Sequence, residues 1–379
     1  MLKLFYDTSP LENFPCGVAV YTGSVLSELA ENPQLDIHTG TRRLNPFGHR
    51  RLRNFVYSRI SEKIKYHPIY LPGRSDLSIL RNFSFDAHKY DIVHFTAHIM
   101  PSYVPFNDLG NALLSVHDMF LWHTEFGKQL NESEKHHVEV LPRQAEQARA
   151  ILTFSEFSKR EIVKFANVAP EKIHVIPEAA QWSFPDRAAD ETAVAPYQLE
   201  AKKYFLAVSS LDPHKNYMSL LIAFDKYRSS KEYAGEKLVI VGGRRHGDEL
   251  VYEKMTSLSE VVHLTNISEA VLHQLYLNAK GAFQLSYIEG FGIPLLEAMS
   301  CRIPACYAKG SSMDEIGRDA AYSVEPEDTD SIKEVFARFS AGGAELDARV
   351  RQAYGISQEY SWKKAAADTF ALYCKLCGK

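Results

Sequence analysis

Short apolar runs alternate with helix-length amphipathic segments along the first half of the chain. The runs at 2–7, 90–96, 112–118, 150–155 and 173–178 are typical of strands. Apolar residues recur at helical spacing at 18–31 and 155–166, and Ser155 is the predicted N-cap of the second of these helices. Because strands alternate with helices, this pattern predicts a parallel sheet covered by helices on both faces.

The same alternation begins again in the second half. Strands are predicted at 204–210, 237–243, 261–265, 281–286, 303–308 and 320–326, and helices at 216–230, 268–280, 294–301 and 357–377. Between the halves, residues 186–199 lose the pattern and read as a linker. We therefore predict an α/β protein with a domain at 1–190, a second at 200–355 and a terminal helix within 356–379. Ligands of such sheets bind beyond the carboxyl ends of the strands, which favours a cleft between two lobes.

Composition supports two soluble domains. The chain has 379 residues, of which 45% are hydrophobic and 24% charged, and no window approaches 18 uninterrupted apolar residues. The N-terminus reads as a first strand and not as a signal peptide, so the expected location is the cytoplasm. Five cysteines do not form a disulfide framework. Cys374 and Cys377 make only half of a zinc site, and core packing is the preferred interpretation for Cys301 and Cys306.

Charge is distributed unevenly. The net charge of −4 argues against a general polyanion binder. Residues 42–65, however, contain eight Lys and Arg against one acid, Glu62, with apolar residues interleaved. This stretch could attract anionic lipid head groups at the cytoplasmic face of the inner membrane. Two alternatives remain equally open, namely a solvated basic face and a helix that packs its apolar side on the core.

The segment "YIEGFGIPLLEAMS", residues 287–300, carries the clearest chemistry. Its first acid, Glu289, follows a predicted strand, whereas Glu297 lies inside the helix that begins near Pro294. Gly290 and Gly292 allow the backbone to approach a ligand, and the first turn of the helix suits a phosphate. The order predicts a hexose near Glu289, a diphosphate at the helix start and a ribose near Glu297.

Over some twenty positions this segment resembles the signature "EGFGLPxLEAMAxGxPVV" of the retaining family 4 glycosyltransferases of GT-B fold. Residues 204–224, "YFLAVSSLDPHKNYMSLLIAF", resemble that family's "fLxVGxLdPRKNlxxLlxAF". The later segments follow in the family's order, and 361–373 resembles the closing helix that returns to the first lobe. The resemblance covers nearly all of 200–375 and, more loosely, the first lobe. It implies two Rossmann-like domains that face each other across a cleft.

The resemblance also implies roles for single residues. Glu289 matches the acid that contacts the transferred sugar, Glu297 the acid that holds the ribose, and Lys215 the lysine that neutralises the leaving diphosphate. Further donor-binding positions are implied at Gly290, Phe291, Gly292, Ile293, Ser210, His214 and Gly243. Two of them depart from the family pattern. His214 stands where Arg is frequent, although it could be a plain loop histidine, and Ser210 stands where some branches place a second Arg.

The first lobe matches less closely. Gly17 resembles the glycine of "GGIGRYT", whose loop approaches the donor phosphate. His117, in "VHD" with Asp118, resembles the histidine beside the reacting sugar carbon. His94 also ends a strand and is a rival, unless it is a core histidine. Ser155 resembles a family position near the cleft, but an ordinary N-cap explains it equally well.

Other chemistries have little support in the sequence. There is no G-x-S-x-G, no P-loop, no D-x-D after a strand to hold a divalent metal and no nucleic-acid-binding motif. The expected function is metal-independent, retaining transfer of a hexose, such as mannose or a deoxyhexose, from a nucleoside diphosphate sugar to a lipid-linked or polysaccharide acceptor. No cofactor is expected. The alternatives are a sugar-nucleotide epimerase, a phosphorylase and a non-catalytic scaffold for glycan assembly.

Overall fold

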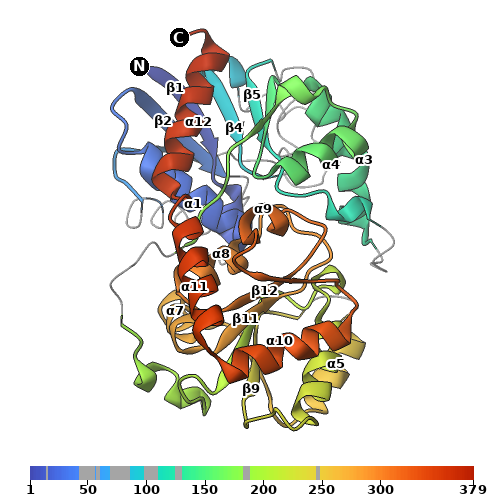
Figure 1. Cartoon of the computed structure of the whole chain (residues 1–379). Coiled ribbons are helices and arrows are strands. Elements are labelled where there is room, and N and C mark those ends of the chain that lie inside the picture. The colour runs from blue at the N-terminus through green and yellow to red at the C-terminus, as the bar shows by residue number, and fades with distance from the viewer. Residues whose placement is uncertain are drawn as a thin grey trace. The chain divides into compact units, whose positions relative to one another are not determined.

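The computed structural model describes residues 1–13, 16–41, 56, 60–68, 86–97, 110–123, 130–181, 188–244 and 248–379. They fall into two compact units. The first is assembled from Met1–Trp122, Leu130–Glu178 and Ser361–Lys379, and the second contains Ala179–Tyr360. The last stretch of the chain therefore belongs to the unit with which the chain begins. Figure 1 shows the elements in chain order.

The described part of the first unit contains a seven-stranded sheet in the order β3-β2-β1-β4-β5-β6-β7. Every neighbouring pair is parallel. Its strands are β1 (Leu2–Asp7), β2 (Leu35–Thr41), β3 (Lys65–Pro68), β4 (Ile92–Phe95), β5 (Ala112–Ser115), β6 (Ala150–Thr153) and β7 (Ile173–Val175). Its helices are α1 (Gly17–Leu29), α3 (Glu132–Gln147), α4 (Glu156–Ala166) and α12 (Trp362–Cys377). The prediction of a parallel α/β sheet is confirmed.

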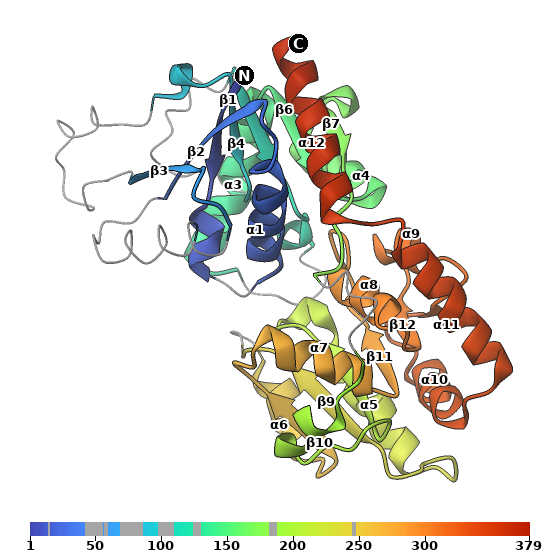
Figure 2. The same ribbon diagram turned by 90° about the vertical axis from the view of Figure 1, so that its left-hand side faces the viewer.

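Helix α12 is joined to the first sheet by a buried hydrogen bond. It packs alongside α1 (Figures 1 and 2). Tyr373 Oη lies 2.6 Å from His94 Nδ1, and His94 Nε2 lies 2.8 Å from Ser115 Oγ. Burial lowers the pKa of His94 to about 3, so the ring is neutral. His94 is thus a satisfied core histidine that ties β4, β5 and α12 together.

The second unit repeats this architecture. Its described residues form a six-stranded parallel sheet in the order β10-β9-β8-β11-β12-β13. The strands are β8 (Tyr204–Val208), β9 (Lys237–Val241), β10 (Val261–Leu264), β11 (Gly281–Gln284), β12 (Ala305–Ala308) and β13 (Tyr322–Val324). The helices are α5 (Tyr217–Arg228), α6 (Glu249–Thr256), α7 (Glu269–Asn278), α8 (Ile293–Ser300), α9 (Met313–Gly317), α10 (Thr329–Ala341) and α11 (Ala344–Ser357).

Side chains along the strands of the second sheet point alternately to its two faces, so each face has its own apolar core. Phe205 and Phe283 point to the face that α5, α6 and α10 cover, where they pack with Phe224 and Phe336. The neighbouring Leu206 points to the opposite face, toward α8. Because both faces are covered, the strands read as continuous apolar runs. This is why the sequence reveals them so clearly.

A buried ion pair and its hydrogen-bond partners join β9, β11, α5 and α10 at the amino-terminal edge of this sheet. Glu236 is fully buried, and its carboxylate accepts hydrogen bonds from Lys280 Nζ (2.5 Å), Ser340 Oγ (2.6 Å) and Tyr227 Oη (3.0 Å). Burial alone raises the pKa of Glu236, but Lys280, Ser340 and other donors bring it down to about 2. The carboxylate is therefore ionised and fully paired.

One predicted segment differs in the structure, and another lies mostly outside the described residues. Residues 188–199 form short 3-10 helices at Glu191–Ala193 and Ala195–Tyr197, and the Asp190 N–H donates to Gln274 Oε1 at 2.8 Å. They belong to the folded second unit instead of forming a linker. The basic stretch 42–65 lies mostly outside the described residues. Of its basic side chains, Lys63 and Lys65 are described, and they pair with Glu31 and Asp36 at 3.2 and 2.8 Å.

Within the described part of the chain, no helix has both the length and the apolar character that a membrane span requires. The same residues contain no group of three or more His, Cys, Asp or Glu arranged to hold a metal ion.

Candidate functional site

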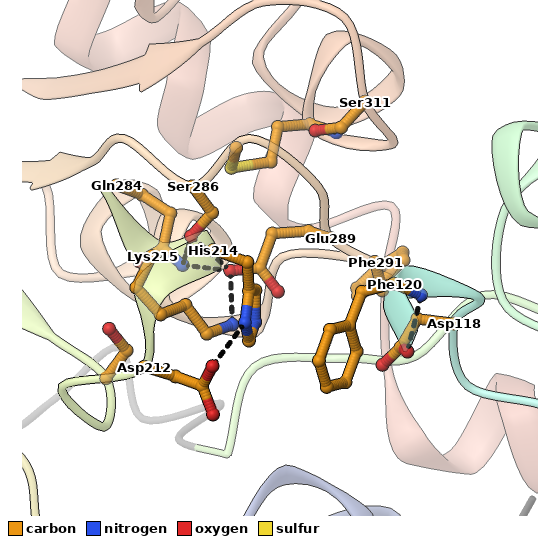
Figure 3. Close-up of polar contacts among 12 residues, drawn as sticks. Asp118, Phe120, Asp212, His214, Lys215, Gln284, Ser286, Glu289, Phe291 and Ser311 are labelled. Atoms are coloured by element: carbon orange, nitrogen blue, oxygen red, sulfur yellow. Dashed lines mark hydrogen bonds and ion pairs between the residues drawn. The ribbon is translucent and has the colours of Figure 1, made fainter. Parts of the chain in front are cut away.

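Lys215 and Glu289 form a largely buried ion pair in the second unit. Lys215 ends the 3-10 helix Pro213–Lys215 after β8, and Glu289 lies in the loop after β11. These loops meet because β8 and β11 are neighbours in the sheet, and the Tyr287 N–H donates to the His214 carbonyl at 2.9 Å. Lys215 Nζ lies 2.7 Å from Glu289 Oε1 (Figure 3), and their side chains are only 15% and 13% exposed.

The carboxylate of Glu289 is held from one side. Ser286 Oγ (2.6 Å) and Gln284 Nε2 (2.5 Å) donate to the same Oε1 atom as Lys215 (Figure 3). Burial alone would raise the pKa of Glu289, but Lys215, His214 and Ser286 bring it below its ordinary value. Within the described residues, Oε2 accepts no hydrogen bond. Glu289 is thus an ionised, fixed acid with one oxygen available to a ligand hydroxyl.

The loop between Glu289 and α8 has a fixed shape. Ser312 Oγ lies 2.8 Å from the carbonyl oxygens of both Glu289 and Phe291. Gly292 has φ 111°, and a Cβ on it would lie 2.9 Å from Met313 Cγ, so only glycine fits. Gly290 and Phe291 are both buried, and the Phe291 ring packs on Tyr360. These contacts therefore constrain the backbone path of the predicted ligand loop.

The first turn of α8 has fewer than the usual four backbone N–H groups available to a ligand. Ile293 opens the helix, and Pro294 has no N–H. The N–H groups of Leu295 and Leu296 both donate to the Gly292 carbonyl, at 3.1 and 3.2 Å. A phosphate at this helix start would therefore depend mainly on side-chain charge.

His214 and its neighbours complete this edge of the sheet. His214 is buried, and its Nδ1 lies 3.0 Å from Asp212 Oδ1 (Figure 3). Ser210 lies in the same loop, where its carbonyl accepts from the Asp212 N–H at 2.8 Å. Gly243, after β9, accepts from the Leu211 N–H at 2.9 Å. The structure therefore gathers the predicted loops after β8, β9 and β11 at one sheet edge.

Glu297, predicted to face a ribose, is 4% exposed. Burial raises its pKa to about 8, against the opposing effect of hydrogen bonds from the Tyr276 hydroxyl and the Gln181 N–H. Its carboxyl group is therefore mostly protonated at neutral pH without ligand. The ribose-binding role stays a prediction.

A glutamine at this position tests the protonation of Glu297. The folded pKa of about 8 lies above the ordinary 4.5, so folding favours the protonated carboxyl. That stabilisation is complete below about pH 4.5 and disappears as pH rises through about 8. Relative to Glu297→Gln, the wild type should lose about 1.4 kcal/mol of unfolding free energy per pH unit between these limits. Urea denaturation across this pH range measures the difference, and parallel pH profiles would contradict it.

The candidate site residues of the first unit lie beyond the carboxyl ends of strands in the first sheet. Gly17 is the exposed first residue of α1, and His117 and Asp118 follow β5. His117 is buried, with Nε2 2.9 Å from the Thr96 carbonyl oxygen and Nδ1 3.4 Å from Glu178 Oε1. Asp118 Oδ1 accepts from the Phe120 N–H at 3.2 Å. Their proposed contacts with a donor stay predictions.

Other sequence predictions are resolved by local geometry. Ser155 caps α4, because its Oγ accepts from the Ser158 N–H at 3.0 Å. Cys301 and Cys306 are buried, Cys374 and Cys377 are half-buried on α12, and all are free thiols. The core interpretation of Cys301 and Cys306 is confirmed.

Sequence reasoning missed four polar residues around these sites. Gln284 and Ser286 hold Glu289, Asp212 holds His214, and Glu178 lies beside His117. A usable signal was present, because each of them lies at the end of a parallel strand or within a few residues after it. Polar residues at the carboxyl ends of parallel strands lie where ligands of such sheets bind.

Two regions of the chain match known protein families. Residues 190–354 match the family described as "Glycosyl transferases group 1", and residues 15–180 match "Glycosyltransferase Family 4". Together the two matches cover most of the chain. The chain belongs to the glycosyltransferases. The family suggested by the "YIEGFGIPLLEAMS" segment is confirmed.

Individual relatives of this glycosyltransferase support the same family assignment. O-antigen chain mannosyltransferase B of Escherichia coli is 27% identical over 60% of this chain and 60% of its own length. The MMP alpha-(1->4)-mannosyltransferase of Mycolicibacterium hassiacum is 28% identical over 63% of this chain and 57% of its own. The matches therefore span about three fifths of these relatives.

A solved structure shows the same fold. Sucrose-phosphate synthase from Thermosynechococcus elongatus superimposes with a TM-score of 0.73, at 16% identity, over 99% of each chain. The fold is GT-B, with two Rossmann-like domains, as the sequence predicts.

Proposed function

We propose that this glycosyltransferase moves a hexose, mannose or a deoxyhexose, from a nucleoside diphosphate sugar to a hydroxyl of a lipid-linked or polysaccharide acceptor. The observation that carries the proposal is the buried Lys215–Glu289 pair beside the start of α8. A cation and a fixed carboxylate suit a leaving diphosphate and a sugar hydroxyl, respectively. The mannosyltransferase relatives support the choice of sugar.

In the proposed reaction the anomeric configuration is retained. The bond between the anomeric carbon and the phosphate oxygen breaks, and the acceptor oxygen attacks the same face of an oxocarbenium-like centre. The departing phosphate takes the proton of the acceptor hydroxyl. Lys215 stabilises the charge that grows on the phosphate, because a positioned cation acts most strongly where charge develops. Glu289 orients the sugar through Oε2, and Glu297 and His117 are assigned to the ribose and the reacting sugar.

A thermal-shift panel of UDP, GDP, ADP and TDP tests the donor class. A nucleotide at 100 times its Kd stabilises the folded state by about 2.7 kcal/mol. We expect GDP to give the largest shift, and transfer of labelled mannose from GDP-mannose to an O-antigen-type acceptor to follow. If no nucleotide shifts the melting temperature and no labelled sugar is transferred, the proposed function is wrong.

Removal of divalent cations tests the proposal of a metal-independent reaction. We expect activity to stay within about twofold after dialysis against EDTA, since Lys215 supplies the charge that a metal ion supplies in other diphosphate sites. Initial rates with and without added Mg²⁺ or Mn²⁺ provide the measurement. Restoration of a lost activity by either ion would show that a metal takes part.

The acceptor side of the proposal includes the membrane. The basic residues of 42–65 would bring the enzyme to the anionic cytoplasmic face of the inner membrane, where a lipid-linked acceptor is found. Sedimentation with phosphatidylglycerol vesicles tests this. The wild type should sediment at low salt, and Arg50→Glu combined with Arg53→Glu should stay in the supernatant. Equal sedimentation of both proteins would remove this part of the proposal.

A further inference from the structure

Gln284 places a polar side chain in the apolar layer between the second sheet and α8. It is the last residue of β11, "GAFQ", and is 5% exposed. It lines the same small cavity as Leu206, Leu295 and Ala298. Burying an amide among apolar groups is unfavourable unless the amide is hydrogen-bonded. The amide of Gln284 therefore depends on its partners, which lie in the loop after β11.

Those partners are Glu289 and Ser286. Gln284 Nε2 lies 2.5 Å from Glu289 Oε1 and 3.3 Å from Ser286 Oγ (Figure 3). Ser286 is 1% exposed and donates to the same Oε1 at 2.6 Å. Because an ionised carboxylate only accepts hydrogen bonds, the amide of Gln284 must donate, and an amide donates at every pH. Two neutral donors thus hold one oxygen of Glu289 independently of Lys215.

Lys215 has a second task in the proposed reaction. One N–H of its ammonium group donates to Glu289 Oε1 at 2.7 Å, and within the described ranges Nζ makes no other hydrogen bond. Burial raises the pKa of Glu289, and Lys215 is the main group that lowers it. A diphosphate on Lys215 would bring negative charge close to Glu289, which opposes this lowering. The neutral donors on Oε1 then become more important.

We propose that Gln284 is a positioning residue, which holds Glu289 for the transferred hexose while the donor diphosphate engages Lys215. This inference rests on the proposed function, since it takes Glu289 as the acid that faces the sugar. With Gln284 and Ser286 on Oε1, Oε2 is the oxygen presented to a sugar hydroxyl. Gln284 acts through Glu289 and does not itself contact the donor.

Gln284→Met keeps the length of the side chain and removes the donor. We expect kcat/KM for GDP-mannose to fall at least tenfold at pH 6 and less than about threefold at pH 8.5, because Glu289 gains a proton as the pH falls. The wild type should be flat over this range. Affinity for GDP, which lacks the hexose, should stay within about twofold of the wild type. The titratable groups described around Glu289, namely Lys215, His214 and Tyr217, are the same in both proteins.

Gln284→Glu tests the same role in the opposite direction. It puts a second carboxyl group beside Glu289 Oε1, and two carboxyl groups in contact share one proton, because both cannot readily ionise. The shared proton replaces the amide donor at low pH and is lost as the pH rises. We therefore expect kcat/KM for GDP-mannose to fall between pH 6 and 8.5, where Gln284→Met recovers. Initial rates across the range give both profiles, and thermal unfolding shows whether each variant is folded.

The matched control is Asn111→Leu, which removes an amide from the first unit. Asn111 Nδ2 donates to the carbonyls of Ala87 and Tyr90, both at 2.9 Å. Its pH profile should run parallel to that of the wild type. A parallel profile in folded Gln284→Met that binds GDP overturns the inference, and so does a parallel profile in Gln284→Glu, which decides alone if Gln284→Met does not fold. A wild type that neither binds GDP nor transfers mannose counts against the proposed function instead.

Discussion

Lys215→Ala is expected to lower kcat by about 10² or more. The Lys215 ammonium lies 2.7 Å from Glu289 Oε1, in the cluster assigned to the leaving diphosphate. Losing one group that stabilises transition-state charge costs about 2.7–4 kcal/mol. The substitution also leaves the buried Glu289 carboxylate without its cation, so its pKa should rise. Steady-state kinetics with saturating donor and acceptor give the measurement.

Two further variants separate this effect from a general loss of charge. Lys226→Ala removes an equal charge from a surface pair with Asp330 and should change kcat less than twofold. Lys215→Arg keeps the charge with another shape and should retain more activity than alanine. A loss below tenfold in Lys215→Ala, in a protein that melts normally, would assign the leaving-group charge to another cation.

Lys280→Met is expected to destabilise the second unit by about 3–5 kcal/mol, because it leaves the buried Glu236 carboxylate without its cation. Glu236 is fully buried and depends on Lys280, Ser340 and Tyr227 for its hydrogen bonds. Its pKa of about 2 lies below the ordinary 4.5, so the pairing stabilises the fold above about pH 4.5 and is lost as pH falls through about 2. Differential scanning calorimetry at pH 7 shows the shift in melting temperature.

A double variant tests the same explanation. Glu236→Leu combined with Lys280→Met removes both charges and should recover most of the lost stability, since apolar replacements of buried pairs are often neutral. Lys226→Met, which opens an exposed pair, should cost less than about 1 kcal/mol. Similar costs for Lys280→Met and Lys226→Met would show that Glu236 is not dependent on its lysine.

The sequence revealed those elements whose hydrophobic pattern is strong. Strands β8, β9 and β11 are buried on both faces and read as apolar runs. Strand β2, "LDIHTGT", was missed because polar residues interrupt it. Helix α3, "ESEKHHVEVLPRQAEQ", was missed because few of its residues are apolar and Pro142 lies inside it. Its capping box, Asn131 with Glu134, was the available signal.

The sequence predicted where the candidate site residues lie in the chain, but not that Lys215 and Glu289 form an ion pair. Spacing and resemblance place Lys215 and Glu289 after strands of one sheet, yet 74 residues separate them, and their contact depends on β8 and β11 being neighbours. Strand order is a tertiary property that a single strand does not encode. The hydrogen bonds of Glu297 were likewise unforeseen, because they come from Tyr276 of another helix and from the Gln181 backbone.

The bond between His94 and Tyr373 has a consequence for biosynthesis. Its two partners are 279 positions apart, and the ribosome makes the entire second unit between them. The nascent first unit therefore lacks this bond, and the packing of α12 on α1, until residues 361–377 have been made. During that interval Tyr21 lacks its ring contact with Trp362, and His94 lacks its hydrogen-bond partner Tyr373. A stop codon placed just before Ser361 should remove these contacts permanently, and the truncated product should be degraded by proteases.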